Sequence, residues 1–359
     1  MTDPSAHSEL ARPAAGKRWV RPSTPQDGPA IVALMRSAGL EPHSDPAQLH
    51  WKYWQARADW PGSRSFVLTD GRDLLAHAAV VPGAFRCGET RARVVHMIDW
   101  AARREMAGVG IRLARHLSGM SDFVLAVGGS HDTRKILPLM GYVQCGTVSG
   151  YVRTISPLAI LSRPMPSRWK LVPRMARSLL WSVMAPRTGT VGWRMRPIGS
   201  EAIEPICGPA SAQRAGMAVF ERSPALFHHA LSCPIVPAEL HGLEKDGRLG
   251  GYFVLSHAPG QARIADMWMD SQDPADWRAL ARAAVDRART RARLAEVTVW
   301  SSDPGLSQVL EDCGFHERLR LPILLQASGS AAIPHDIMRV QMLDSDAFYL
   351  YCGGNELWA

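Results

Sequence analysis

The spacing of apolar residues from Trp19 onward switches between the two-residue period of strands and the 3.6-residue period of helices. A short strand precedes a helix that starts near Pro25, and "DPAQLHWKYWQAR" predicts a second helix with Asp45 as its N-cap. The segment "SFVLTDGRDLLAHAAVVPGAFRCG" predicts a hairpin that turns at Asp70 and Gly71. "ARVVHMIDWAA" and "DFVLAVGG" then predict apolar strands on either side of a basic helix pattern.

The same order of elements returns in the second half of the chain. The turn "DGR" at 70–72 recurs at 246–248, and "ARVVHMID" is echoed by "ARIADMWMD". "VLAVGGSHDTRKILPLMGY" aligns without a gap with "VTVWSSDPGLSQVLEDCGF", which places Gly141 opposite Gly314. We interpret this similarity as two copies of one domain, because a solenoid would repeat at a much shorter period.

A pair of glycines marks a place where the two copies differ. In "REMAGVGIRLARH", Gly108 and Gly110 lie where the apolar strand meets the basic helix, whereas the second copy has "SQDPADWRALARA" there. Glycine allows unusual dihedrals, and backbone N–H groups at a helix N-terminus can bind an anion. We therefore expect a phosphate-binding loop, with Arg104 and Arg112 adding positive charge. The loop matches neither a P-loop nor a dinucleotide GxGxxG motif, and an ordinary tight turn is the alternative.

The glycine loop and the order of elements resemble motif A and the fold of the GNAT acyltransferase superfamily. The resemblance implies a mixed α/β sheet with two acyl-CoA N-acyltransferase (GNAT) folds in tandem, the second of them degenerate. It divides the chain into four parts: a disordered tail (1–17), an N-terminal GNAT domain (18–155), a basic amphipathic linker (156–196) and a C-terminal GNAT-like domain (197–359).

The resemblance also implies a site for acetyl-CoA or another acyl-CoA, and no metal. In that family the loop N–H groups hold the coenzyme A pyrophosphate, the neighbouring strand binds the acyl carbonyl, and an amine attacks the thioester directly. Carried onto this sequence, the cofactor-binding residues are Ile98, Trp100, Arg104, Glu105, Met106, Ala107, Gly108, Val109, Gly110, Ile111, Arg112 and Ser130.

Three positions depart from the family's pattern. Glu105 stands at the first loop position, usually Gln or Arg, and puts an anion near the pyrophosphate, for which Arg104 can compensate. Ser130 replaces the usual Asn, and Leu137 replaces the tyrosine that often protonates the leaving thiolate. The last loss is tolerable, because a thiolate whose thiol has a pKa of about 8.5 leaves without much help.

An amine acceptor is mostly protonated at neutral pH, so its attack needs a base. His96 lies nine residues before Glu105, where enzymes of the family often carry Glu or His, and its ordinary pKa of about 6.5 suits the task. Asp99 is the second candidate. Strand alternation predicts His96 and Ile98 on one face and Met97 and Asp99 on the other. Simple packing of His96 in the sheet, and a structural role for Asp99, are the alternatives.

The aromatic stretch "HWKYW" belongs to the second predicted helix, which borders the acceptor cleft in the resembled fold. Trp51, Tyr53 and Trp54 are therefore candidates for a substrate-binding wall. Core packing of an amphipathic helix is the alternative.

Composition bears on the ligand's charge and on the cellular compartment. The chain has 359 residues, is 46% hydrophobic and carries a net charge of +8, which suits two globular domains and an anionic ligand. A general bias toward arginine explains the charge equally well. Six scattered cysteines without zinc spacing fit reduced thiols of the cytosol. No signal peptide or long apolar run appears, so we expect a cytoplasmic location.

The segment 162–196 has eight basic residues, no acidic residue and interleaved apolar residues. The pattern predicts a basic amphipathic helix that Pro173 interrupts. Such a helix can lie on the anionic inner face of a membrane or bind an acyl carrier protein. A plain linker helix between the copies is the alternative.

These features together predict a bacterial-type N-acyltransferase of EC 2.3.1 type. We expect it to transfer an acyl group from an acyl-CoA, with acetyl-CoA as the expected donor, to an amine of a small molecule or cell-envelope precursor. One alternative is a long-chain transferase that depends on acyl carrier protein, and another is a non-catalytic GNAT-like binding module. Nucleic acid is not an expected partner, because no reading motif is present. The sequence leaves the oligomeric state open.

Overall fold

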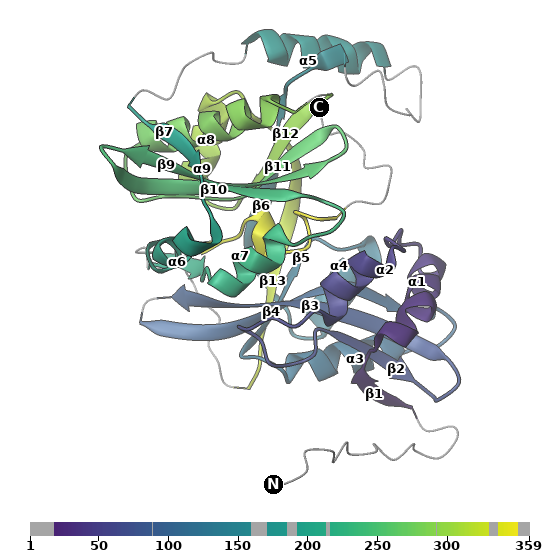
Figure 1. Cartoon of the computed structure of the whole chain (residues 1–359). Coiled ribbons are helices and arrows are strands. Elements are labelled where there is room, and N and C mark those ends of the chain that lie inside the picture. Colours follow the sequence, from purple (N-terminus) through teal and green to yellow (C-terminus); the bar gives the residue numbers. More distant parts are fainter. Residues whose placement is uncertain are drawn as a thin grey trace.

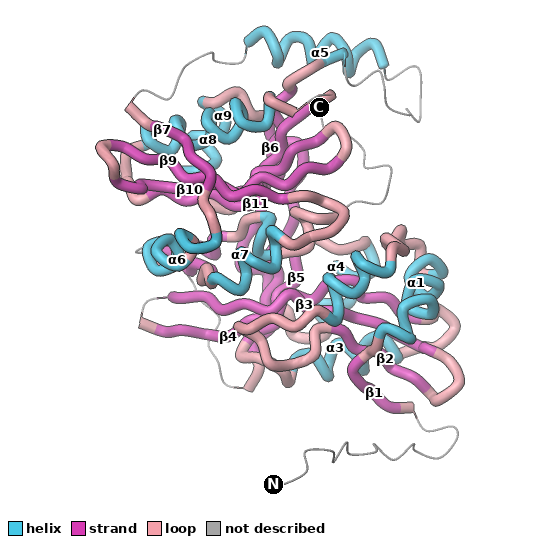
Figure 2. Tube along the Cα trace, viewed as in Figure 1, coloured by secondary structure: helices cyan, strands magenta, loops and turns pink. Residues whose placement is uncertain are grey.

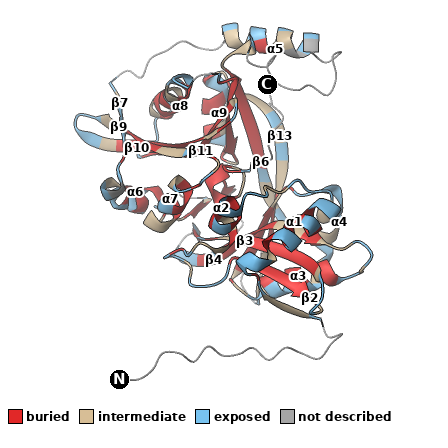
Figure 3. Cartoon of the chain, turned by 45° about the vertical axis from the view of Figure 1, so that its right-hand side comes forward, coloured by how far each residue is buried: buried red, intermediate tan, exposed pale blue. Residues whose placement is uncertain are grey.

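The computed structural model describes residues 18–87, 89–158, 171–184, 192–212, 216–291, 293–329 and 337–350. The predicted tail (1–17) and parts of the predicted linker lie outside the described residues. One curled, mixed sheet runs through both halves of the chain, and helices cover its faces (Figures 1 and 2). Most residues of the strands are buried in both halves (Figure 3).

The first half follows the predicted order of elements. Its elements are β1 (Trp19–Pro22), a 3-10 turn (Pro25–Asp27), α1 (Gly28–Ser37), α2 (Pro46–Leu49), a π-helical turn (His50–Trp54), β2 (Ser65–Thr69), β3 (Leu74–Cys87), β4 (Thr90–Ala102), α3 (Val109–Ser118), β5 (Phe123–Val127), α4 (His131–Leu139) and β6 (Val143–Thr154). The Asp45 carboxylate caps α2 as predicted, accepting a hydrogen bond from the Gln48 N–H at 3.0 Å.

The second half repeats this order after helix α5 (Leu171–Met184). Its elements are β7 (Arg194–Pro197), a 3-10 turn (Ser200–Ala202), α6 (Glu204–Ala210), β8 (Met217–Phe220), α7 (Pro224–Leu231), β9 (Ala238–Lys245), β10 (Arg248–Ala258), β11 (Gln261–Met269), α8 (Pro274–Arg289), β12 (Glu296–Ser301), α9 (Pro304–Asp312), β13 (His316–Ala327), β14 (Ile337–Arg339) and a last 3-10 turn (Met342–Asp344). Pro173 lies in the first turn of α5, where no intrahelical N–H bond is lost. The part of the predicted basic helix before Leu171 lies outside the described residues, so the predicted interruption at Pro173 stays a prediction.

Strands β6 and β13 are exchanged between the two halves. The sheet order is β1-β2-β3-β4-β5-β13-β6-β12-β11-β10-β9-β7, so β13 lies between β5 and β6. Both neighbours of β6, namely β12 and β13, therefore belong to the second half, and both pair with it antiparallel. The exchanged strands cross the predicted division of the chain, and the domain limits at 155 and 197 stay a prediction.

Helices α1 and α3 cover opposite faces of β2–β4. Val67 packs with Ile31 of α1, whereas the adjacent Phe66 and Leu68 pack with Leu113 of α3, as expected from the alternation of side chains along a strand. The face under α1 carries the candidate acceptor side, and α3 starts directly after the end of β4.

A bulge interrupts β4 just before its end. Ala79 of β3 lies opposite Ile98, but His77 lies opposite Ala101, so β4 contains one extra residue. Asp99 has a positive φ of 51° in this bulge. The bulge breaks the alternation, and the prediction that Asp99 and Ile98 point to opposite faces is wrong. Asp99 instead bonds Tyr53, which packs in the same cluster as Ile98 under α1.

The last described segment, 337–350, folds back onto the second half. The Arg222 guanidinium joins the carboxylates of Asp266 and Asp344, with N–O distances of 2.7 and 2.6 Å, and all three side chains are buried. The Ser256 hydroxyl donates to the Phe348 carbonyl at 2.7 Å. These bonds bring Tyr349 next to the first half. Among the described residues, no helix has the length and apolar character that a membrane crossing requires.

Candidate functional site

The glycine loop forms the N-terminus of α3, which has no side-chain cap. Its two glycines are required for different reasons. Gly108 is the N-cap of α3 with a φ of 79°, a conformation that strains other residues, and a Cβ there would meet nothing within 4 Å. Gly110 instead allows close packing, because a Cβ there would lie 3.1 Å from the Ala102 Cβ. The first bond into the helix runs from the Arg112 N–H to the Gly108 carbonyl at 2.9 Å. The N–H groups before it therefore point outward without an acceptor in the helix.

The charges around this loop are mostly basic. Arg103 lies 3.1 Å from Asp73 and 3.8 Å from Glu105, so the carboxylate at the first loop position faces a guanidinium. Arg104 lines a surface cavity of about 590 Å³ between α1 and the β2–β3 hairpin. The Arg112 guanidinium donates to the Arg18 carbonyl at 2.8 Å. The positive end of the helix dipole adds to these charges.

The remaining predicted loop residues divide into an exposed rim and a buried base. Arg104, Glu105, Ala107 and Gly108 are exposed. Val109 and Ile98 are buried, and Met106, Ile111 and Trp100 are half-buried. The Trp100 indole N–H donates to the Gly110 carbonyl at 3.0 Å and ties the end of β4 to α3.

The equivalent helix of the second half, α8, has an N-terminus that is capped by a side chain. The Asp273 carboxylate accepts the N–H of Ala275 at 2.8 Å, and Pro274 occupies the first helical position. A carboxylate at this position takes up a free N–H and repels an anion. Among the described residues, only the first half therefore has a helix N-terminus without a side-chain cap at this junction.

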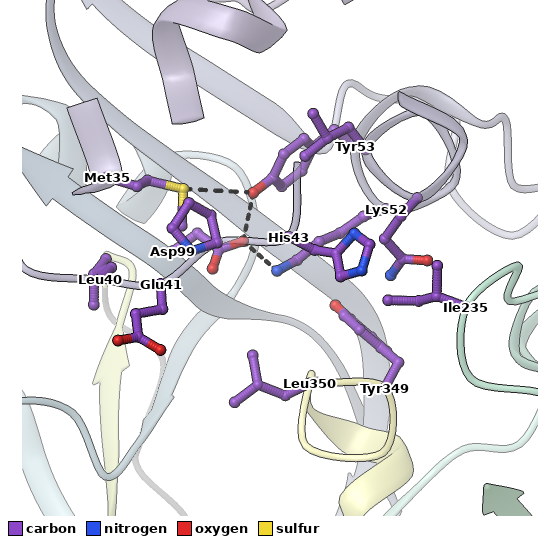
Figure 4. A pocket seen from close by; sticks show the side chains of 13 residues that line it. Met35, Leu40, Glu41, His43, Lys52, Tyr53, Asp99, Ile235, Tyr349 and Leu350 are labelled. Atoms are coloured by element: carbon purple, nitrogen blue, oxygen red, sulfur yellow. Dashed lines mark hydrogen bonds and ion pairs between the residues drawn. The ribbon is translucent and has the colours of Figure 1, made fainter. Parts of the chain in front are cut away.

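Beyond the fork of β4 and β5 lies a cluster of charged and aromatic side chains. The two strands pair in parallel from Val94 to His96 only, and the last pair is His96 with Leu125. Past this point, the Asp99 carboxylate accepts a hydrogen bond from the Tyr53 hydroxyl at 2.7 Å. The same carboxylate lies 2.5 Å from the ammonium of Lys52 (Figure 4). At most a tenth of the Lys52 and Asp99 side chains is exposed.

The Asp99 carboxyl is ionised in this setting. Burial alone would raise its pKa, but attraction to Lys52 and hydrogen bonds from Lys52 and Tyr53 outweigh burial and hold the pKa below its ordinary value. Burial and the neighbouring carboxylate raise the pKa of Tyr53 well above its usual range, so its hydroxyl keeps its proton and donates.

A chain of hydrogen bonds supports the bulge from below. The Trp54 indole donates to Ser23, Ser23 donates to Ser65, and the Ser65 hydroxyl lies 3.0 Å from His77 Nε2. His77 Nδ1 lies 3.2 Å from the carbonyl of Asp99, and burial lowers the pKa of His77 to about 4. His77 is thus neutral, with its proton on Nδ1 toward the carbonyl. Trp54 acts here as a donor that positions the bulge.

The last described segment completes the cluster from the second half. Tyr349 places its ring 5.4 Å from the Lys52 ammonium, and Figure 4 shows both side chains at one cavity. Asp346, one turn earlier, also interacts with Lys52 and Asp99. Burial raises the pKa of Asp346 to about 6, since the attraction of Lys52 is opposed by the repulsion of Asp99. Asp99 and Asp346, both attracted by Lys52, thus have pKa values on opposite sides of the ordinary value.

This cluster borders a cavity of about 170 Å³. Its walls come from the loop after α1 (Leu40, Glu41 and His43), from the cluster (Lys52, Tyr53 and Asp99), and from the second half (Ile235 and Tyr349). Most of the lining is apolar, and Lys52 and Asp99 form an ion pair on one wall. Such a mixture can hold a small molecule that carries a cationic group.

His96 is placed at the fork but apart from this cavity. It is buried, it bonds to the backbone of Asp344, and burial lowers its pKa to about 4. Its Nδ1 has no hydrogen-bond partner in the described part of the chain. The ring is therefore neutral at pH 7 with a lone pair on Nδ1, which is the form that a base requires, although its basicity is weak.

Three further predicted residues are held by contacts within the protein. Trp51 is buried between the halves, where its ring stacks on His229 at 4.4 Å and its indole donates to the His229 carbonyl. Ser130 caps α4 by accepting the Thr133 N–H at 3.2 Å. Leu137, which stands where the family often has tyrosine, is fully buried. Of the three predicted wall aromatics, Tyr53 alone lines the described cavity at Asp99.

Sequence reasoning missed Lys52, Asp346 and Tyr349. The lone lysine within "HWKYW" is a weak signal, because a cation among aromatic residues of a half-buried turn needs a partner. Asp346 and Tyr349 belong to no motif, and only the fold of the last segment brings them to Lys52.

Comparisons with known proteins identify the fold. No family model matches the sequence, and no curated protein matches it. The crystal structure of a GCN5-related N-acetyltransferase from Anabaena variabilis ATCC 29413 matches with a TM-score of 0.59 and 12% identity, over 87% of this chain and 73% of that chain. One from Kribbella flavida matches with a TM-score of 0.54 and 13% identity, over 87% and 71% of the two chains.

A third similar structure contains a long acyl donor. Saccharomyces cerevisiae N-myristoyltransferase, with bound myristoyl-CoA and inhibitors, matches with a TM-score of 0.58 and 12% identity, over 89% of this chain and 82% of that chain. At such identities the likeness concerns the fold. The chain has the mixed α/β fold of the GCN5-related N-acetyltransferases, the GNAT fold.

Proposed function

We propose that the protein is an N-acyltransferase that takes an acyl group from an acyl-CoA and transfers it to a small primary amine. One observation carries this proposal. Beyond the pair of His96 and Leu125, β4 separates from β5 and leads to the uncapped N-terminus at Gly108. The likeness to acyltransferases of the same fold supports the proposal.

The pyrophosphate of the acyl-CoA would bind the free N–H groups of Val109, Gly110 and Ile111, with Arg104 and Arg112 beside them. The thioester would lie along β4 past His96. There the backbone polar groups that faced β5 have lost their strand partners and can bind a carbonyl oxygen. The loop residues at 104–112 thereby position a donor whose thioester supplies the activated acyl group.

The acceptor amine would enter the cavity at Asp99. Lys52, Asp99 and an ionised Asp346 together carry one net negative charge, which favours an ammonium group. A proton passes from the ammonium to the Asp346 carboxylate, which interacts with Lys52 and Asp99 but is not itself a wall residue of the cavity. The neutral amine then attacks the thioester carbon. The C–N bond forms, the C–S bond breaks, and the thiolate takes up the proton that the new amide nitrogen loses. His96 and Asp99, the bases proposed from the sequence, are the alternatives to Asp346 in this step.

The cavity favours a small amine-bearing group over a large one. Its volume of about 170 Å³ corresponds to roughly six waters at about 30 Å³ each. An acetyl donor and a small acceptor, or the amine end of a larger cell-envelope precursor, fit this volume.

Thermal unfolding with acyl-CoA ligands tests the proposal directly. The full chain is heated alone and with acetyl-CoA, butyryl-CoA or palmitoyl-CoA, and Gly108→Asp is compared with the wild type. An aspartate at this position would place a carboxylate at the start of α3, where it would repel a phosphate. Ligand at about 100 times its Kd should stabilise the wild type by about 2.7 kcal/mol and leave the variant unchanged.

Gly247→Asp is the matched control. Gly247 has a φ of 76° and, like Gly108, nothing within 4 Å of a Cβ. The two variants therefore introduce a similar backbone strain, but at different places in the chain. The control should keep the full response to ligand. If no acyl-CoA stabilises the wild type, the proposal fails in its CoA-dependent form, and a donor on acyl carrier protein or a non-catalytic binding module takes its place.

A further inference from the structure

A row of buried polar side chains crosses two neighbouring strands of the second half. Glu296 of β12 and Gln261 and Arg263 of β11 are each at most 4% exposed. The Gln261 amide donates a hydrogen bond to the Glu296 carboxyl group at 2.6 Å, and the Arg263 guanidinium donates to the Gln261 amide oxygen at 2.8 Å. A guanidinium that is held in one orientation in this way directs its other N–H groups at a fixed target.

The target is the turn 346–349, in which the last N–H donates to the first carbonyl at 3.2 Å. Arg263 donates to the Ala347 carbonyl of this turn at 2.9 Å. The next carbonyl, that of Phe348, accepts a hydrogen bond from Ser256 of β10 at 2.7 Å. Both middle carbonyls of the turn are therefore bound by side chains from the sheet of the second half.

This turn carries two residues of the second half that reach the candidate site. Tyr349 is a wall residue of the cavity at Asp99 (Figure 4). Asp346 interacts with Lys52 and Asp99. Because both residues belong to one short turn, a side chain that fixes its carbonyls also fixes where Asp346 and Tyr349 meet the first half.

Arg263 also acts on the Asp346 carboxyl through its charge. Burial raises the pKa of this carboxyl, attraction to Lys52 lowers it, and repulsion by Asp99 raises it. The positive charge of Arg263 lowers this pKa as well, although its hydrogen bond goes to the adjacent carbonyl. Burial also raises the pKa well above its usual range for the two tyrosines that interact with this carboxyl, Tyr53 and Tyr349. Arg263 thus assists Lys52 in favouring the carboxylate form of Asp346.

We infer that Arg263 is a positioning residue for the acceptor side of the site. From the second half it holds the turn 346–349 against Lys52 and favours the form of Asp346 that accepts a proton. Arg263 is not a wall residue of the cavity, so it acts through Asp346 and Tyr349. The inference rests on the proposed function, in which Asp346 takes the proton of the acceptor amine.

The pH profile of acyl transfer tests this role. In the wild type, kcat/KM should rise through about pH 6, the pKa of Asp346. Arg263→Met removes the charge and should move the midpoint upward by at least about 0.5 pH units. Arg263→Lys keeps the charge and should return the midpoint to within about 0.2 units of the wild type, even if kcat stays lower. Arg263→Gln replaces the methionine variant if that chain does not fold, with the same upward shift expected.

Two controls separate the charge from support of the turn. Ser256→Ala removes the hydrogen bond to the Phe348 carbonyl but no charge, so kcat can fall while the midpoint stays in place. Arg248→Met removes a positive charge from a side chain that is 81% exposed, and it should change neither quantity. An unchanged midpoint in Arg263→Met, or an equal shift in Ser256→Ala, would contradict the inference.

Unfolding equilibria test the same link without any need for activity. The pKa of Asp346 is about 6 in the folded chain and about 3.9 in the unfolded chain. Between these values the folded chain binds more protons, so this carboxyl makes stability fall as the pH rises toward 6. Arg263→Met should extend the fall to about pH 7, and adding Asp346→Asn should abolish the extension. Urea unfolding at a series of pH values measures both slopes.

The two measurements separate this inference from the proposed function. A slope difference that disappears in the double variant supports the link between Arg263 and Asp346, even if the wild type transfers no acyl group. In that case only the proposed function fails. Active acyl transfer with the same midpoint and the same slope in the wild type and Arg263→Met overturns the inference alone.

Discussion

The ammonium of Lys52 lies 2.5 Å from the carboxylate of Asp99, in a place where at most a tenth of either side chain is exposed. The pair joins the turn after α2 to the bulge of β4. A buried ion pair adds little net stability, but removing one partner leaves a charge that nothing balances.

Lys52→Met should therefore lower the free energy of unfolding by about 3–5 kcal/mol. Adding Asp99→Asn should restore much of that loss, since the amide carries no charge and can still accept the Tyr53 hydroxyl. Urea unfolding at neutral pH measures both. Lys135→Met on the exposed surface of α4 serves as control and should change the value by less than about 0.5 kcal/mol. Equal stability of the two Lys52 variants would contradict an ionised Asp99.

Asp346 should determine the acid side of the pH profile. Its pKa is raised to about 6, so its basic form is present above that pH, and kcat/KM should rise with pH through about 6 and then level off. Asp346→Asn should lower kcat at least about 100-fold, with a smaller change in KM, and remove the rising limb. The assay follows thiol release from acetyl-CoA with a panel of primary amines.

A different result in this assay would reassign the base. If Asp346→Asn keeps its activity while His96→Ala loses it most strongly near neutral pH, His96 takes the proton instead. Asp99→Asn gives the same comparison for Asp99, provided that its melting curve matches the wild type.

Buried histidines should make the fold sensitive to acid. Burial lowers the pKa of His77 and of His96 to about 4, whereas each returns to about 6.5 on unfolding. Between these values the unfolded chain binds more protons, so stability is complete above about pH 6.5 and falls as the pH falls toward 4. Each histidine contributes up to about 3 kcal/mol to this loss.

His96→Gln should make the dependence of the unfolding free energy on pH shallower between pH 4.5 and 6.5. The difference should approach one proton, or about 1.4 kcal/mol per pH unit. His131→Gln, on the exposed surface of α4, should leave the slope as it is. An unchanged slope for His96→Gln would mean that the ring is already protonated in the folded state.

The strand exchange predicts that the halves need each other. A chain cut after residue 165 should yield two pieces that are each poorly folded, because β6 has lost both β12 and β13 and leaves exposed edges. Expressed together, the pieces should assemble into a one-to-one complex. Size exclusion and circular dichroism of the single and co-expressed pieces distinguish this from two halves that fold alone.

Local patterns were sufficient for much of the fold. The hairpin turn at Asp70 and Gly71, the cap at Asp45 and the helix start at Gly108 follow from residue types at adjacent positions. Each is controlled by dihedral preferences and by hydrogen bonds within a few residues. The repeated order of elements was readable for the same reason, since both halves use the same local signals.

Other features depend on pairings that are distant in sequence. Strand β5 could pair with β6 or with β13, because both have the period and composition of a strand, and the choice depends on the assembled sheet. The bulge at Asp99 looks like ordinary alternation in the sequence, because nothing in "HMIDW" marks the extra residue. It moved Asp99 to the face where Lys52 and Tyr53 lie.

The candidate site and helix α5 also combine features predictable from local sequence with features that depend on long-range packing. The sequence by its own periodicity predicted an amphipathic helix within 162–196 and a helix start at Gly108, since periodicity and glycine position are properties of a short segment. The anion-binding role of that loop stays a prediction. The tertiary structure decided which side of α5 faces outward and that Asp346 joins Lys52 and Asp99. Burial and charge proximity arise only when distant segments pack together, and they determine which of many polar residues acquires unusual chemistry.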